Sequence, residues 1–183
     1  GGAGFIGANL VRSLCSRPDV EDVVVIDNLS FGFRSYIDDL NATFLEGSIL
    51  DRRLVAEAMD GTSSVVHLAA RSSVPRSIAH PMAAHEDNAT GTAVILEAAR
   101  SESDVQVIVA SSSSVYGANE TLPKHEGLAP RPVSPYAATK LATESYTLAW
   151  GHSYDMPVLA LRLFNVFGPL QPPLHAYAAV IPA

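Results

Sequence analysis

A tyrosine and a lysine four residues apart, Tyr136 and Lys140, are the side chains of this 183-residue sequence best suited to proton transfer. Ser134 and Pro135 predict the start of a helix just before them, and residues four apart lie on one face of a helix. Lowering the pKa of a phenol from about 10 to near 7 takes roughly 4 kcal/mol. A lysine roughly 5.5 Å away supplies about 3 kcal/mol of that. The pair therefore predicts a tyrosine base that needs a second positive charge, although isolated pairs of this kind also occur on solvent-facing helices.

A run of four serines, Ser111 to Ser114, follows the apolar segment 105–109. If that segment is a buried strand, the serines stand at its carboxyl end, where sheets of α/β proteins bind ligands. A hydroxyl at that edge can form a hydrogen bond to a reacting oxygen of a ligand. The alternative is a polar loop before Gly117, and the run itself does not tell which serine faces the site.

Three glycines, Gly1, Gly4 and Gly7, form a G-x-x-G-x-x-G motif directly before a helical pattern. Such glycines let backbone N–H groups approach a pyrophosphate at a helix N-terminus. Asp27 ends a strand pattern 20 residues after Gly7, where a carboxylate accepts hydrogen bonds from an adenosine ribose. Because that carboxylate repels a 2′-phosphate, the cofactor is expected to be NAD rather than NADP, although Arg34 lies near. Oxidised nicotinamide would supply the second positive charge.

The elements that must position these residues alternate along the chain. Apolar, β-branched runs predict strands buried on both faces at 23–26, 65–68 and 105–109, and shorter strands are expected at 43–45 and 158–161. Helical spacing recurs between them, and a helix is expected from Tyr136 to Trp150, ending near Gly151. The order predicts an α/β fold with a Rossmann-type, doubly wound parallel sheet.

The glycine motif is the turn that leaves the first strand of such a sheet, so we expect that strand to precede Gly1. Without it the centre of the sheet is interrupted, and the 183 residues alone are expected to be poorly stable and inactive. The composition turns to proline and aromatic residues after Arg162. We therefore expect a nucleotide-binding domain over 1–165 and the start of a substrate-binding region over 166–183.

Composition excludes several classes of protein. The chain is 48% hydrophobic and 17% charged, with a net charge of -7, which is typical of a globular protein without affinity for nucleic acid. It contains neither a membrane-length apolar run nor a signal-peptide pattern, so a cytoplasmic protein without membrane contact is expected. His67 lies in a predicted buried strand and the other histidines lack ligand spacing, so no metal site is expected.

Several motifs together resemble the extended short-chain dehydrogenase/reductases, and among them the nucleotide-sugar epimerases, closest to the UDP-glucose 4-epimerase family. The matching stretches are GGAGFIG from Gly1, DNLS from Asp27, HLAA from His67, SSVYG from Ser113, YAATK from Tyr136, RLFNVFGP from Arg162 and YAAVIP from Tyr177.

The resemblance implies roles for individual residues. It makes Ser112 the catalytic hydroxyl, Tyr136 the base and Lys140 its helper. It implies cofactor contacts for Gly1, Gly4, Phe5, Ile6, Gly7, Asp27, Asn28, Ser48, Ile49, Leu68, Ala69, Ala70, Asn88, Tyr136, Lys140 and Phe164. It implies substrate contacts for Ser73, Val74, Ser112, Ser113, Tyr136 and Asn165.

The implied reaction is NAD-dependent 4-epimerisation of a nucleotide sugar, with a UDP-hexose as substrate, in a homodimer of the full-length protein. A related nucleotide-sugar oxidoreductase, decarboxylase or dehydratase is the alternative, as is a non-catalytic NAD-binding sensor. Ser48 stands where many members carry an aspartate that holds adenine, so weaker adenine recognition is expected. Dehydratases carry Thr-Asp-Glu where this chain has Ser112 to Ser114, which disfavours dehydration.

Overall fold

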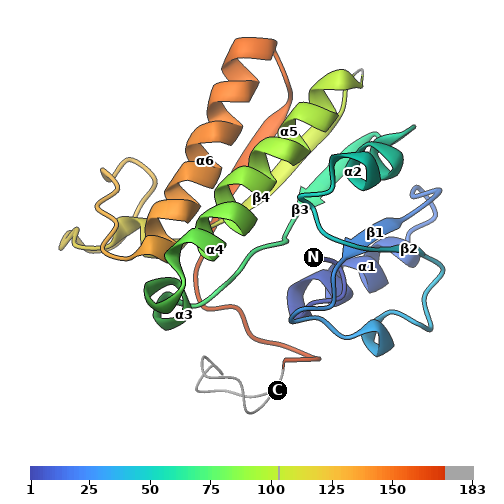
Figure 1. Cartoon of the computed structure of the whole chain (residues 1–183), viewed down its shortest axis with the longest axis horizontal. Coiled ribbons are helices and arrows are strands. Elements are labelled where there is room, and N and C mark those ends of the chain that lie inside the picture. Colours follow the sequence, from blue (N-terminus) through green and yellow to red (C-terminus); the bar gives the residue numbers. More distant parts are fainter. Residues whose placement is uncertain (103, 172–183) are drawn as a thin grey trace. The chain divides into compact units, whose positions relative to one another are not determined.

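The computed structural model describes residues 1–102 and 104–171. Helices and strands alternate along this part of the chain (Figure 1). The helices are α1 Phe5–Cys15, α2 Arg52–Met59, α3 Val74–Ala79, α4 Pro81–His85, α5 Gly91–Ser101 and α6 Pro135–Tyr154, with short 3-10 or π segments at η1 Arg34–Tyr36, η2 Glu86–Thr90 and η3 Ser113–Tyr116. The strands are β1 Val24–Asp27, β2 Thr43–Glu46, β3 Ser64–His67, β4 Gln106–Ser112 and β5 Val158–Leu163.

All strand pairs of the described chain are parallel, which confirms the predicted α/β class. They form a two-stranded sheet, β1–β2, and a three-stranded sheet in the order β3–β4–β5. The chain divides into two compact units: one holds Gly1–Asp60 with the described residues from Asn165 onward, and the other holds Gly61–Phe164. The predicted region 166–183 lies largely outside the described residues, so the predicted domain boundary stays a prediction.

The first unit is built around β1, β2 and the helix α1. Its buried core consists of Ala3, Ala8, Val11, Val25 and Ile37. Glycine is required at the turn into α1, because a Cβ on Gly7 would lie 2.3 Å from the carbonyl oxygen of Gly1. The small side chains of this turn therefore let the helix start close against β1.

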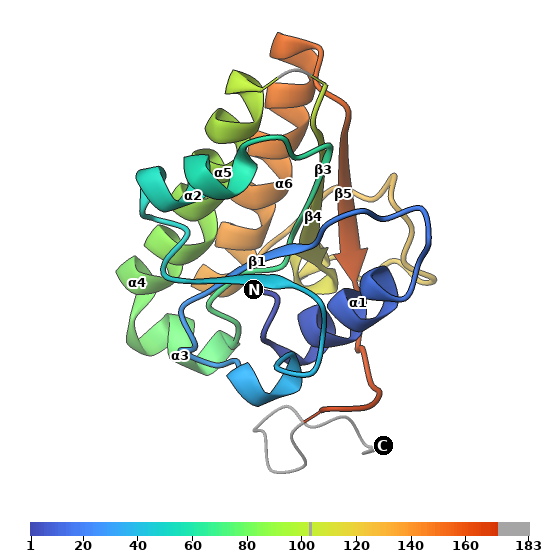
Figure 2. The ribbon, with the colours of Figure 1, turned by 90° about the vertical axis from the view of Figure 1, so that its right-hand side faces the viewer.

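The second unit places α5 and α6 along one face of the sheet β3–β4–β5 (Figures 1 and 2). Val107 and Val109, which point towards the helices, are fully buried, whereas Leu159 and Leu161 are 46% and 42% exposed. Burial on both faces was predicted for β3 as well as for β4, and for β3 the prediction is wrong, because Val66 is 38% exposed. The physical reason is that the helices of this unit cover only one face of its sheet.

Helix α6 is longer than predicted and runs to Tyr154 rather than ending near Gly151. Gly151 lies inside it because this side of the helix touches β5: a Cβ there would lie 2.4 Å from Cγ2 of Val158. Asp155 takes the left-handed conformation that ends the helix, which Asp tolerates better than most residues. The glycine therefore permits close packing and does not mark a helix end.

Candidate active site

The serine and the tyrosine singled out in the sequence meet at the end of β4. Strand β4 continues through Ser112, and Tyr136 lies in the first turn of α6. The hydroxyl of Ser112 lies close enough to the phenol of Tyr136 to lower its pKa, and Ser112 Oγ accepts a hydrogen bond from the backbone N–H of Ser114 at 3.1 Å. The neighbouring Ser111 turns to the opposite side and contacts α6. The structure thus distinguishes Ser112 from Ser111, which the sequence run did not.

Lys140 lies one turn after Tyr136 and is buried beneath it, with 5% of its surface exposed. Its Nζ donates a hydrogen bond to the carbonyl oxygen of Ala110 on β4 at 2.8 Å. Burial lowers the pKa of Lys140 to about 8. Burial also raises the pKa of Tyr136, while the nearby hydroxyl of Ser112 lowers it. The protein alone therefore does not prepare a phenolate, and the help predicted from Lys140 and a second positive charge stays a prediction.

Two serine hydroxyls fix the turn of α6 that carries Tyr136. Ser134 caps the helix by accepting a hydrogen bond from the N–H of Ala137 at 3.1 Å. Ser77 on α3 accepts from the N–H of Tyr136 at 2.9 Å and donates to the carbonyl oxygen of Val74 at 2.7 Å. Ser77 is fully buried. No local sequence pattern points to Ser77, because its partner Tyr136 lies 59 residues further along the chain.

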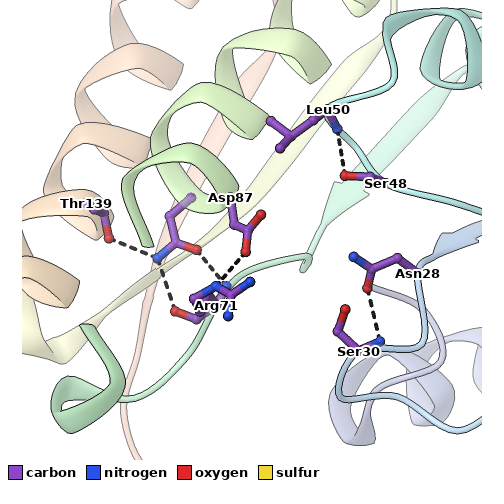
Figure 3. Close-up of polar contacts among 8 residues, drawn as sticks. Asn28, Ser30, Ser48, Leu50, Arg71, Asp87 and Thr139 are labelled. Carbon is purple, nitrogen blue, oxygen red and sulfur yellow. Dashed lines mark hydrogen bonds and ion pairs between the residues drawn. The ribbon is translucent and has the colours of Figure 1, made fainter. Parts of the chain in front are cut away.

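Asn88 ties the segment after β3 to α6 (Figure 3). Its side-chain oxygen accepts a hydrogen bond from the N–H of Arg71 at 2.7 Å, and its Nδ2 donates to Thr139 Oγ1 at 2.9 Å and to the Arg71 carbonyl oxygen at 3.2 Å. Arg71 also pairs with Asp87 at 2.7 Å. Asn88 is 1% exposed, so in this structure it holds the backbone next to Ala70 in place. Its direct contact with a cofactor stays a prediction.

A buried ion pair joins α6 to β5 next to the segment that carries Tyr136 and Lys140. Glu144, one turn after Lys140 on α6, accepts two hydrogen bonds from the guanidinium of Arg162 on β5, at 2.5 and 3.0 Å. It accepts a third from Ser111 Oγ at 3.0 Å, and Arg162 lowers the pKa of its carboxyl. Arg162 in turn lies over the ring of Tyr116, 4.8 Å from its centroid. In the sequence, Glu144 is marked only by its position one helical turn after Lys140, which places it on the same face of the helix as Tyr136 and Lys140.

A cavity of about 350 Å³ is lined by Ser113 and Ala137, the sequence neighbours of Ser112 and Tyr136, which are not themselves among its lining residues. It includes the predicted residues Val74, Ser113 and Phe164, and its full lining is Val74, Ser113, Ser114, Tyr116, Gly117, Lys124, Val133, Ser134, Ala137 and Phe164. Ser73, also predicted, caps α3 with φ of 104° and is buried. This size is within the range of small-molecule sites.

The first unit carries the residues predicted to hold the dinucleotide. Helix α1 has Gly4 as its N-cap without a side-chain hydrogen bond, so its first N–H groups, from Phe5, Ile6 and Gly7, face outward from a glycine turn. A Cβ on Gly7 would fill this turn. A helix N-terminus of this kind favours an anion, so the turn fits the pyrophosphate of NAD.

Asp27 ends β1 and its carboxylate is 8% exposed. Its Oδ2 accepts a hydrogen bond from the N–H of Ala3 at 3.0 Å, and Oδ1 accepts from the N–H of Leu29 at 2.9 Å. Each carboxylate oxygen can accept a second hydrogen bond, so a ribose hydroxyl remains compatible with this arrangement. The predicted ribose contact stays a prediction.

The remaining predicted cofactor residues of the first unit hold turns. Asn28 Oδ1 accepts a hydrogen bond from the N–H of Ser30 at 3.1 Å, and Ser48 Oγ accepts from the N–H of Leu50 at 3.2 Å, on the far side of Ile49 (Figure 3). Ser48 therefore has a local role as the acceptor that closes this turn. Leu68 to Ala70 lie half-buried in the second unit, whereas Asn165 belongs to the first.

Two other kinds of site were sought among residues 1–102 and 104–171. No group of three or more His, Cys, Asp or Glu side chains is placed to hold a metal ion there. His67 is buried, with its Nε2 3.2 Å from Thr92 Oγ1, and burial lowers its pKa to about 3. No helix in these ranges is both long and apolar enough to cross a bilayer.

The parallel α/β fold, the glycine turn before α1 and the Ser-Tyr-Lys group define a protein of the dinucleotide-dependent short-chain dehydrogenase/reductase class. The family model for the NAD dependent epimerase/dehydratase family matches residues 1–183, and the chain belongs to that family. This confirms the predicted family and its cofactor, NAD.

Known relatives include both epimerases and dehydratases. The chain is 37% identical over 181 residues to the UDP-glucose 4-epimerase of Erwinia amylovora, covering 92% of this chain and 52% of that protein. It is 34% identical over 183 residues to the dTDP-glucose 4,6-dehydratase of an Actinoplanes strain, covering 94% and 57%. The solved UDP-glucose 4-epimerase of Thermotoga maritima with UDP-glucose superposes with a TM-score of 0.91 at 35% identity, covering 98% and 58%. The chain thus spans about half the length of these relatives.

Proposed function

We propose that the complete protein interconverts UDP-hexoses by NAD-dependent epimerisation at C4. The observation that carries this proposal is the approach of the Ser112 hydroxyl to the Tyr136 phenol, with Lys140 buried one turn further along α6. Their sequence neighbours Ser113 and Ala137 line the cavity. A non-catalytic sensor of NAD would have no need of an ionisable group held in this way.

The chain's own residues would act on a sugar hydroxyl at the edge of the cavity. Tyr136 takes the proton of the C4 hydroxyl, and Ser112 donates a hydrogen bond to the same oxygen. NAD, when bound, supplies the hydride acceptor and donor. The product of oxidation is a 4-keto sugar, and reduction from its other face gives the epimer. Tyr136 returns the proton in that second step.

The side chains beside Ser112 favour epimerisation over dehydration. Elimination of water from a 4-keto sugar needs an acid to protonate the leaving hydroxyl. Ser113 and Ser114 stand at the cavity, and none of the described residues that line it is Asp or Glu. Without such an acid the 4-keto sugar is expected to be reduced again before it loses water.

The experiment is product analysis with the complete protein, NAD and either UDP-glucose or dTDP-glucose. We expect a mixture of UDP-glucose and UDP-galactose, with no net consumption of NAD. Formation of a 4-keto-6-deoxy sugar from dTDP-glucose as the main product would overturn the proposal in favour of dehydration. Net formation of NADH would overturn it in favour of an oxidoreductase.

A further inference from the structure

The cavity lined by Ser113 and Ala137 has an electrostatic character opposite to that of the chain. The chain carries a net charge of -7, and its 12 basic residues include only two lysines, Lys124 and Lys140. Lys124 lines the cavity, and the other described lining residues contribute hydroxyls, apolar groups and Gly117 but no carboxylate. The cavity is therefore a positively charged, hydroxyl-lined site.

Lys124 holds its charge without an acidic partner in the described chain. Its Nζ donates hydrogen bonds to the backbone carbonyl oxygens of Thr121, at 2.9 Å, and Asn119. Both acceptors are neutral, so the positive charge of the ammonium is not neutralised by them. An ammonium has three N–H donors, which leaves one for a ligand.

The loop that carries Lys124 is held firmly at its base. The N–H of Ala118 donates to the carbonyl oxygen of Arg131 at 2.9 Å, and the N–H of Arg131 donates to that of Val115 at 3.0 Å. Gly117 has φ of 47°, and a Cβ there would lie 1.9 Å from the Arg131 carbonyl oxygen. The two ends of the loop therefore stay together, and Lys124 is presented from a closed loop rather than from a free strand of chain.

The position of the cavity tells which part of a nucleotide sugar would meet Lys124. Ser134 and Ala137 flank Tyr136 in sequence, Ser113 follows Ser112, and all three line the cavity. If Tyr136 acts at C4, the groups nearest the cavity are those on the two neighbouring carbons, the C3 hydroxyl and the C5 substituent, whereas the C1 diphosphate is at the opposite end of the ring. Of these two groups only the C5 substituent, through C6, can carry a negative charge that would match Lys124.

We propose that the cavity takes a carboxylate at C6, bound by Lys124 and the surrounding serine hydroxyls, so that a nucleotide-linked hexuronic acid is preferred over the uncharged UDP-hexose. This inference rests on the proposed function, because it uses C4 as the reacting carbon. A carboxylate offers acceptors for the free N–H of Lys124 and for serine hydroxyls, and it neutralises a charge that has no other acidic partner in the lining.

The test compares binding and turnover of UDP-glucuronate and UDP-glucose by the NAD-loaded complete protein. Lys124→Gln removes the charge but keeps N–H donors for the two loop carbonyls, and Lys124→Arg keeps the charge. Arg131→Gln is the matched control, because it removes a positive charge from the same loop at an exposed side chain outside the cavity lining. Calorimetric Kd values and kcat/KM are measured for each protein, and thermal unfolding verifies that each is folded.

We expect the wild type to bind UDP-glucuronate more tightly than UDP-glucose. Lys124→Gln should raise the Kd for UDP-glucuronate by about tenfold or more, as for loss of a hydrogen bond between charged groups, and change that for UDP-glucose by less than about threefold. Lys124→Arg should retain most of the preference for UDP-glucuronate over UDP-glucose, and Arg131→Gln should retain all of that preference.

Equal weakening of both ligands by Lys124→Gln would show that the lysine serves the diphosphate or the loop, and would overturn the inference. Unchanged binding of both would overturn it as well. Tighter binding of UDP-glucuronate that depends on the charge of Lys124, without epimerisation of either sugar, would refute the proposed reaction and support the carboxylate site. Epimerisation of UDP-glucose with no preference for UDP-glucuronate would support the reaction and refute the carboxylate site.

Discussion

Substitution of Ser77 by alanine tests whether a residue on α3 positions the proposed base on α6. Ser77 does not line the cavity, and its hydroxyl connects the N–H of Tyr136 to the carbonyl oxygen of Val74. The substitution removes one fully buried oxygen and leaves the N–H of Tyr136 without this acceptor. It changes no group that would touch the sugar.

The expected cost follows from these two hydrogen bonds. An amide left without its partner in a protein interior costs about 1 to 3 kcal/mol, and this contact is partly buried, so we expect a loss near 1 to 2 kcal/mol in the free energy of unfolding. A displacement of about 1 Å in a catalytic group lowers the rate by roughly a hundredfold. A smaller shift of Tyr136 should therefore lower kcat by about tenfold while KM stays nearly constant.

The assay combines urea unfolding with steady-state kinetics of the complete protein. Ser153→Ala, at an exposed position in the last turn of α6, is the control and should change neither quantity. Ser77→Thr, which keeps the hydroxyl, should lose less activity than Ser77→Ala. Loss of stability with unchanged kcat would refute the positioning role, and unchanged stability would refute the hydrogen-bond argument itself.

Three further predictions concern Tyr136, the Glu144–Arg162 pair and His67. Tyr136→Phe removes only the ionisable oxygen, so turnover should vanish while NAD titration shows unchanged binding; near-normal rates would mean that the base is another group. Glu144→Gln leaves Arg162, whose side chain is 13% exposed, without its charge partner, and should lower the free energy of unfolding measured in urea by about 3 kcal/mol. The double variant Glu144→Gln, Arg162→Met should recover part of that loss. Burial lowers the pKa of His67 to about 3, so between about pH 6.5 and pH 3 the unfolded chain binds one more proton than the folded chain. The free energy of unfolding therefore decreases as the pH is lowered through that window. From pH 7 to pH 5 the loss is about 2 kcal/mol, and a pH dependence unchanged in His67→Gln would contradict this account.

The sequence alone determined those features that depend on local spacing. The apolar β-branched runs predicted the strands, and the glycines predicted the tight turn into α1, because each pattern is a property of neighbouring residues. Tyr136 and Lys140 were paired correctly on one helix for the same reason. The family followed from the joint set of these motifs.

Only the tertiary structure decided what depends on contacts between elements. The side to which Ser111 or Ser112 turns follows from the packing of β4 against α6, and no local spacing encodes it. Gly151 looked like a helix end but provides room for Val158, since its role is set by a neighbouring strand. The charge of Lys124 became informative only when folding placed it in a cavity without carboxylates. Helices, strands and turns depend on residues that are close together in the sequence, so their pattern can be recognised there. The direction of a side chain and the charge of a cavity depend on segments that are far apart in the sequence and pack together only in the folded chain.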